Sequence, residues 1–319
     1  MNQSFRRFKD IVNIMGACAA SATGVNMRLQ ETTGACLRSM RDGPCDYKTE
    51  RRIDMTIVMV LLLLPVTGYA QWLNYPTAGV PRLPNGQPNL TAPPPRTLEG
   101  RTDFTGLWEP DTSGGTQLST FRTDVVFPPE WYNIGAQLKD GLPFSSWARE
   151  LRDARKAENS KDSPDAKCLP MGPFLDHSNR SPRKIVQVPG LVIILYEKSF
   201  AYRQIFTDGR PLPTDPQPSF YGYSSGKWEG DALVVQTVGL RDNGWADQEG
   251  SPITEAAKVR ERFRRPSFGS LEIELTVDDT KAYTAPWTVK LRHHIKLDTD
   301  LLEYVCNENE KDASHLVGK

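Results

Sequence analysis

The chain has 319 residues, with 39 basic and 39 acidic side chains, so its formal net charge is zero. This balance gives no bulk electrostatic argument for a nucleic-acid partner or for an anionic membrane surface. No apolar run reaches the about 18 to 20 residues that a bilayer-spanning helix needs.

The longest apolar run, residues 57–66, is typical of the core of a secretory signal peptide. It is too short to span a bilayer, and the small residues Gly68 and Ala70 follow it where a signal-peptide cleavage site has them. We expect a signal peptide over 55–70, cleavage before Gln71, and a periplasmic or secreted protein with no stable membrane insertion. A buried core strand and a retained signal anchor are the alternatives.

The signal peptide divides the chain. Residues 1–54 show no periodic apolar face, so we interpret them as an upstream extension absent from the mature protein. Translation then starts at Met1 or at Met55. The part from Gln71 onward holds 249 residues, of which 30 are basic and 33 acidic, and is large enough for one sizeable domain.

Only two of the five cysteines, Cys168 and Cys306, lie beyond the signal peptide. In an oxidising compartment such a pair predicts one disulfide, whose loop of about 138 residues would contribute about 4 to 5 kcal/mol. Two buried free thiols are the alternative. Neither cysteine has ligand-spaced partners, so we expect no metal and no cofactor.

Two segments precede the strands. Residues 71–103 contain seven prolines and few aliphatic side chains, which predicts a Pro-rich disordered arm or an arm on the surface. The stretch SSWARELRDARKAENS (145–160) is rich in helix formers, with Trp147 and Leu151 on one face, and predicts one peripheral helix.

From residue 183 the sequence alternates between strand-like runs and tight turns. Turn pairs occur at Pro189-Gly190, Asp208-Gly209 and Glu229-Gly230, and the stretch PSFG closes a further hairpin. With TGLWEP near residue 107, and with WTVKLRHHIKL and LLEYVC at the end, we expect about nine or ten strands.

Such a run of consecutive strands must hide its edges, and closure into a barrel does so. We therefore predict an all-β domain over 104–319. Its expected form is an antiparallel up-and-down, lipocalin-like barrel of about 8–10 strands with one peripheral helix. The pair Gly106-x-Trp108 fits a lipocalin-like first strand only weakly, and a sandwich or a propeller fragment are the alternatives.

One carboxylate breaks the alternation of the predicted hairpin over 258–278. Glu261 lies between Val259 and Phe263, on the face expected to point inward. It is either a ligand anchor or general acid/base, or one half of a structural ion pair with an inward arginine, for which Arg203 is a candidate.

The long loops 207–223 and 240–255 carry most of the remaining polar and aromatic candidates, which are also explained as turn formers. As ligand-binding residues we predict Arg203, Asp208, Arg210, Tyr221, Tyr223, Trp228, Trp245 and Asp247.

Motifs of familiar enzyme classes are missing from the sequence: it contains no GxSxG, HExxH, Walker A or GxGxxG. His293 and His294 are adjacent, so on a strand they point to opposite faces and do not form one metal site.

Several strings, YRQIFTDGRPLP, GKWEGDALVV, VRERFRR and LLEYVCNENEK among them, resemble a large family of exported, uncharacterised soil-bacterial proteins. The resemblance covers about residues 100–319 and implies a signal peptide, a β-rich domain and the cysteine positions, but no activity. Family members tend to have a histidine where this chain reads Pro252-Ile253-Thr254. If that histidine is catalytic in relatives, this chain is not an enzyme of the same kind.

The sequence thus predicts an exported barrel that holds a small, largely apolar or aromatic ligand, with Glu261 and Arg203 as polar anchors and the two long loops as the rim. A barrel enzyme, hydrolase or isomerase, with Glu261 as general acid/base is the first alternative. A structural, envelope-associated protein is the second.

Overall fold

The computed structural model describes residues 75–113, 115–117, 126–198 and 201–306, which belong to one compact unit, Tyr69–Lys319. Both the predicted signal peptide, 55–70, and the upstream extension, 1–54, lie outside the described residues.

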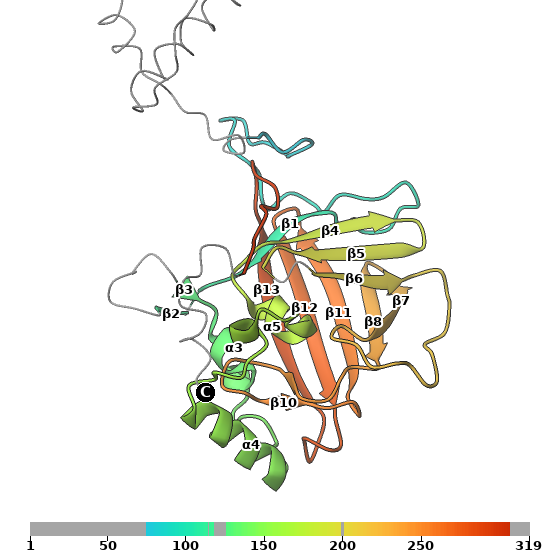
Figure 1. Cartoon of the computed structure of the whole chain (residues 1–319). Coiled ribbons are helices and arrows are strands. Elements are labelled where there is room, and N and C mark those ends of the chain that lie inside the picture. The colour runs from blue at the N-terminus through green and yellow to red at the C-terminus, as the bar shows by residue number, and fades with distance from the viewer. Residues whose placement is uncertain (1–74, 114, 118–125, 199–200, 307–319) are drawn as a thin grey trace, which may run out of the picture. The chain divides into compact units, whose positions relative to one another are not determined.

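A closed barrel of nine strands forms the centre of this unit (Figure 1). Around the ring the strands are β1 (Gly106–Pro110), β4 (Arg183–Val188), β5 (Leu191–Tyr196), β6 (Ala201–Phe206), β7 (Tyr223–Glu229), β8 (Ala232–Val238), β11 (Lys258–Ser267), β12 (Ser270–Asp278) and β13 (Trp287–Ile295). Two short pairs stand apart from it: β2 (Thr116–Gln117) with β3 (Val126–Phe127), and β9 (Gly244–Trp245) with β10 (Pro252–Ile253). The predicted all-β barrel is confirmed.

The barrel is not antiparallel throughout, because β6 and β7 run parallel to each other. Strands that alternate in direction cannot close a ring when their number is odd, so one parallel junction is required. A parallel pair cannot be joined by a hairpin. This is why the chain between β6 and β7 is the long loop 207–222, which returns from one end of the barrel to the other; we call it the crossover loop.

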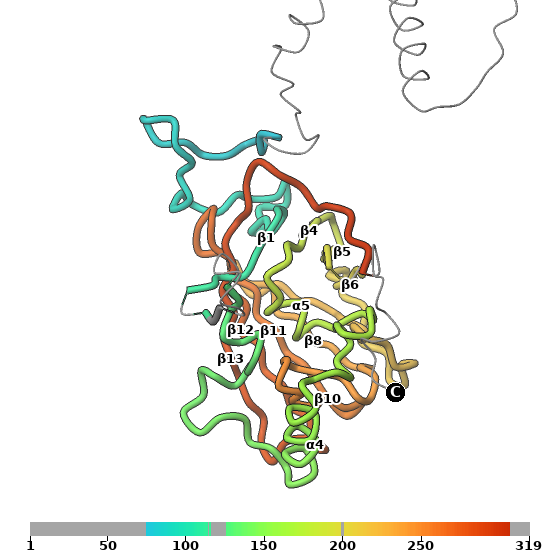
Figure 2. Tube along the Cα trace, turned by 60° about the vertical axis from the view of Figure 1, so that its left-hand side comes forward, coloured from blue at the N-terminus to red at the C-terminus, as the bar shows by residue number. Residues whose placement is uncertain are grey.

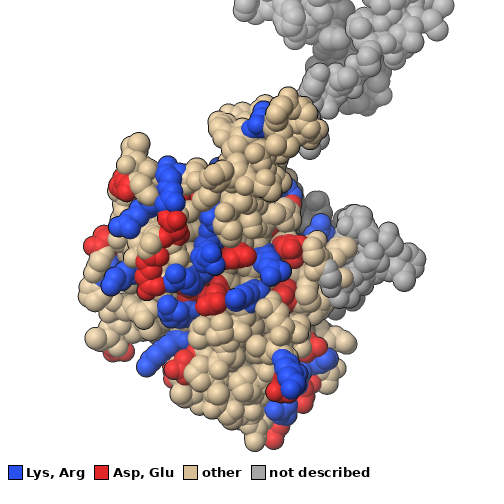
Figure 3. Space-filling view, turned by 180° about the vertical axis from the view of Figure 1, so that it is seen from behind, with Lys and Arg blue, Asp and Glu red and all other residues tan. Residues whose placement is uncertain are grey.

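The predicted inward and outward faces of the last strands are confirmed. Val259, Glu261 and Phe263 of β11 lie inside, opposite the inward residues of β12. On the outer face Arg262 lies opposite Glu274, and basic and acidic side chains interleave over the surface (Figure 3).

Tight turns join the strands at two of the three predicted turn pairs, whereas Asp208-Gly209 begins the crossover loop. Gly190 and Gly230, with φ of 76° and 60°, allow the β4–β5 and β7–β8 hairpins. The prediction of a last strand at LLEYVC is wrong, because residues 301–306 have no strand partner. This segment is held by the disulfide instead: Cys168 and Cys306 are bonded, as predicted.

The chain has more helix than the single peripheral helix that we expected. The predicted helix is α4 (Ser146–Ala157), whose first turn is capped by the Ser145 hydroxyl. The other helical elements among the described residues are α3 (Pro129–Tyr132), α5 (Gly172–Ser178), η1 (Ile134–Gln137) and η2 (Asp165–Lys167). None of the helices in these ranges is long and apolar enough to cross a bilayer.

Helix α5 lies within the ring of strands, as Figures 1 and 2 both show, and all seven of its residues are buried. It therefore fills the part of the barrel interior where we expected a ligand.

The Pro-rich segment has defined contacts in its described part, 75–103. It makes two closed turns, bridged at Arg82–Pro88 and at Arg96–Thr102. Backbone hydrogen bonds from Phe268 to Ala92 and from Gly269 to Leu90, 2.7 and 2.8 Å long, attach it to the β11–β12 turn. The segment is thus an arm on the barrel surface.

Candidate functional site

Glu261 and Arg203 meet inside the barrel. Arg203 comes from β6 and Glu261 from β11, and both are fully buried. Nη1 of Arg203 donates to Oε1 of Glu261 over 2.9 Å, and its Nη2 donates to Oε2. Two further guanidinium hydrogens reach Ser224 Oγ at 3.1 Å and Thr237 Oγ1 at 2.8 Å. The two side chains form a bidentate pair with every charged group engaged.

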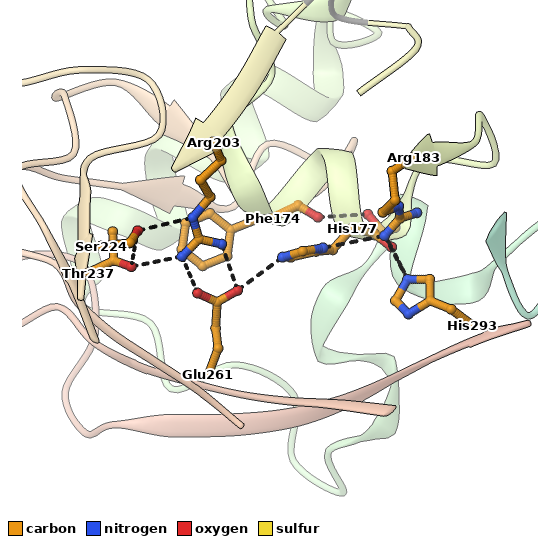
Figure 4. A network of polar contacts seen from close by, with 9 residues as sticks. Phe174, His177, Arg183, Arg203, Ser224, Thr237, Glu261 and His293 are labelled. Atoms are coloured by element: carbon orange, nitrogen blue, oxygen red, sulfur yellow. Dashed lines mark hydrogen bonds and ion pairs between the residues drawn. The ribbon is translucent and has the colours of Figure 1, made fainter. Parts of the chain in front are cut away.

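Helix α5 extends this network through His177 (Figure 4). His177 Nε2 lies 3.0 Å from Oε1 of Glu261 and, since a carboxylate only accepts, this nitrogen carries the proton. The other ring nitrogen, Nδ1, accepts from Nη1 of Arg183 over 3.3 Å. Arg183 in turn lies 2.7 Å from Nε2 of His293. The network ties α5 to β4, β6, β11 and β13.

Protonation in this network is fixed by burial and by the arginines. Burial alone would raise the pKa of Glu261, but the charge and hydrogen bonds of Arg203 outweigh it and hold the pKa at about 2. Burial lowers the pKa of His177 to about 4, against the opposing effect of Glu261. Glu261 is thus a permanent carboxylate whose oxygens are already bonded, which favours the structural ion pair over acid–base chemistry.

A pocket opens at the barrel end where the crossover loop arrives. Its volume is about 210 Å³, and we call it the mouth pocket. Buried apolar side chains form its floor: Met171, Pro173, Phe174, Leu240, Trp245 and Ile253. Phe220 makes one wall, and charged residues stand only at the rim. An apolar floor with a polar rim is the usual composition of a small-molecule site.

The crossover loop builds one side of this pocket. Its end is fixed to the chain after β8, because Ser219 N donates to Gly239 O over 2.9 Å and Arg241 N donates to Ser219 O over 3.0 Å. These bonds place Phe220 beside Arg241, whose guanidinium carbon lies 4.4 Å from the ring centre. Both long loops therefore line the mouth pocket, the crossover loop through Phe220 and the second loop through Leu240 to Trp245, together with the segment 162–174.

Trp245 and Asp247 both come from the second long loop, with different surroundings. Trp245 is buried in the pocket floor, and the guanidinium of Arg155 stacks on it at 4.4 Å. Asp247 is fully buried away from the pocket, where it accepts from Ile134 N at 3.0 Å and from Ser251 Oγ at 2.7 Å. Burial raises the pKa of Asp247 to about 6. Its contacts attach the loop to η1.

The other predicted ligand residues are spread over the molecule. Asp208 and Arg210 pair with each other on the surface at the opposite end of the barrel. Tyr223 is exposed, whereas Tyr221 is buried and donates to Asp176 of α5. Trp228 stacks on Phe104 and lines a cavity of about 480 Å³ between the arm and the barrel, which we call the arm cavity. Of the eight predicted residues, only Trp245 lines the mouth pocket.

Sequence reasoning missed most of the pocket. Phe220 precedes the predicted Tyr221, and Leu240 and Arg241 lie in the predicted loop 240–255, but nothing in their spacing distinguishes them from core or turn residues. Residues 169–174 of the stretch LPMGPFL (169–175) also line the pocket, so the start of α5 contributes part of its floor. Its Gly-Pro pair, with φ of 77° at Gly172, is a signal for a helix start that we did not use.

The histidine pair behaves as the strand alternation predicts. His293 is buried in the network, while His294 lies on the outer face, 2.9 Å from Glu109. Within the described ranges, no cluster of three or more His, Cys, Asp or Glu side chains is arranged to hold a metal ion.

Comparisons of the chain with protein-family models, with curated proteins and with solved structures give no match. The class of protein is therefore defined by the fold and the pocket: an all-β barrel, closed by nine strands, with its interior filled by a helix and a small pocket at one end.

Proposed function

We propose that the chain is an exported barrel protein that binds a small, largely apolar or aromatic ligand in the mouth pocket. The observation that carries the proposal is the apolar floor of that pocket, closed on one side by the wall of Phe220. Export to the periplasm or the medium is supported by the disulfide between Cys168 and Cys306, which forms under oxidising conditions.

The size of the pocket limits the ligand. Its 210 Å³ is below the about 300 to 1,000 Å³ of sites for drug-sized molecules, so a single ring or a short aliphatic chain fits best. The floor includes Trp245 and Phe174, whose ring surfaces favour an aromatic ligand.

The buried network does not support the enzyme that uses Glu261. Glu261 and Arg203 line neither the mouth pocket nor the arm cavity, and a carboxylate with a pKa of about 2 is a poor proton donor near neutral pH. One observation does favour a structural, envelope-associated role as the second candidate: α5 fills the interior that a lipocalin-like binder would keep open.

Binding of an uncharged probe, benzyl alcohol, distinguishes the two candidates. Saturation-transfer NMR should detect binding to the wild-type chain, and Phe220→Ala should weaken it about fivefold, because one aromatic contact is lost. Phe206→Ala is the matched control, since Phe206 is also half-buried under a stacked arginine but lies outside the pocket. Absent binding, or equal losses in both variants, favours the structural role.

A further inference from the structure

The rim of the mouth pocket carries two acidic and two basic side chains. They are Asp162, Lys167, Arg241 and Asp242. Three of them have partners within the chain: Lys167 Nζ is 2.8 Å from Asp162, and Oδ1 of Asp242 accepts from the Glu255 backbone at 2.9 Å. Arg241 differs, because no carboxylate within the described ranges lies within 4.0 Å of its guanidinium.

Arg241 is nevertheless held in place. Its backbone is hydrogen-bonded to Ser219, and its guanidinium rests on the ring of Phe220. Stacking uses the flat face of a guanidinium and leaves the N–H groups at its edge free to donate in the plane. Two parallel donors in a plane match the two oxygens of a carboxylate.

A second arginine of the same chain shows this geometry in full. The guanidinium of Arg210 lies 3.8 Å from the ring centre of Phe206. Its Nε donates to Oδ1 of Asp208 over 3.0 Å, and its Nη2 donates to Oδ2 over 2.6 Å. This chain therefore already contains an arginine that stacks on a phenylalanine and binds a carboxylate with its N–H groups. Arg241 stacks in the same way, but it lies at the rim of the mouth pocket, whose floor is apolar.

We propose that the mouth pocket selects a small carboxylic acid with an aromatic or apolar body. The carboxylate binds the edge of Arg241, and the body lies on the floor formed by Leu240, Trp245 and Ile253. This inference rests on the proposed function and further specifies that the ligand is an anion. Because Arg241 is exposed, the preference for an anion should weaken as salt is added.

Benzoate and benzamide test the inference, because they have the same shape and differ in charge. Titrations followed by ligand-observed NMR at pH 7 should show benzoate bound about tenfold more tightly than benzamide by the wild-type chain, as expected for one charge-assisted contact. Arg241→Gln should remove this preference and keep benzamide binding within about twofold. Arg210→Gln, the matched control, should leave both affinities unchanged.

Each other outcome has a definite meaning. Equal binding of benzoate and benzamide by the wild-type chain, or a preference that persists in Arg241→Gln, overturns the inference and leaves the proposed function standing. If Arg210→Gln, and not Arg241→Gln, removes the preference for benzoate, the carboxylate binds at Arg210 and the inference is overturned. Binding of neither probe overturns the proposed function together with the inference.

Discussion

Replacing Glu261 by Gln should reveal whether the buried network is structural. The side chain is fully buried and accepts from Arg203 Nη1 at 2.9 Å, from Arg203 Nη2 and from His177 at 3.0 Å. An amide removes the negative charge and places N–H donors against the N–H donors of Arg203. Leaving one buried charge without its partner typically costs about 3 to 5 kcal/mol, and we expect a loss of this size.

Urea unfolding followed by far-UV circular dichroism measures the loss. Glu272→Gln is the matched control, because Glu272 faces an arginine 4.0 Å away on the outer surface, where both side chains are exposed, and it should lose less than about 1 kcal/mol. The double variant Arg203→Met/Glu261→Met should recover much of the stability, since it removes both buried charges. A Glu261→Gln chain as stable as the control would refute the structural role. Unchanged affinity for benzyl alcohol is expected in every variant that folds.

Two further predictions concern protons and the disulfide. His177 should titrate near pH 4 in NMR spectra of the folded chain, against about 6.5 for a free histidine. Its neutral form stabilises the fold fully above pH 6.5, and about 3 kcal/mol of this is lost as the pH falls to 4. Asp247, whose pKa is raised to about 6, has the opposite effect: it increases the unfolding free energy as the pH falls from 6 to 3.8. The decisive measurement is therefore the titration of His177 itself. A pKa near 6.5 for His177 would contradict the buried geometry. Reduction of the disulfide, which spans 138 residues, should lower the unfolding free energy by up to about 5 kcal/mol. Cys168→Ser should match reduced wild type in urea, and a loss below about 1 kcal/mol would show that the crosslink adds little.

Much of the barrel could be predicted because its signals are local. Alternation along β11 and β12 was enough to place Glu261 inside, and Arg203 was a candidate for its inward partner. The turn glycines at 190 and 230 marked two hairpins. The disulfide followed from the number of cysteines that lie beyond the predicted signal peptide.

What could not be predicted depends on long-range packing. Helix α5 has seven residues and is buried on every side, so it shows no amphipathic period that would distinguish it from a loop. The parallel junction of β6 and β7 follows from the number of strands that close the ring, which no single segment encodes. LLEYVC has the composition of a strand, but the closed barrel has no free edge to which it could add.

The candidate site was only partly predictable for a related reason. Trp245 was found because an aromatic residue is unusual in a polar loop. Asp208 and Arg210 looked similar, yet they satisfy each other on the surface. Phe220 and Arg241 come together only through the backbone hydrogen bonds of the crossover loop, which a sequence pattern does not show.

Ligand binding in the mouth pocket is tested most directly by intermolecular nuclear Overhauser effects from bound benzyl alcohol. With methyl groups labelled, the ring protons should contact Leu240 and Ile253 in the pocket floor. Contacts to Leu98 and Val188, which line the arm cavity, would place the ligand at the other end of the barrel and contradict the account.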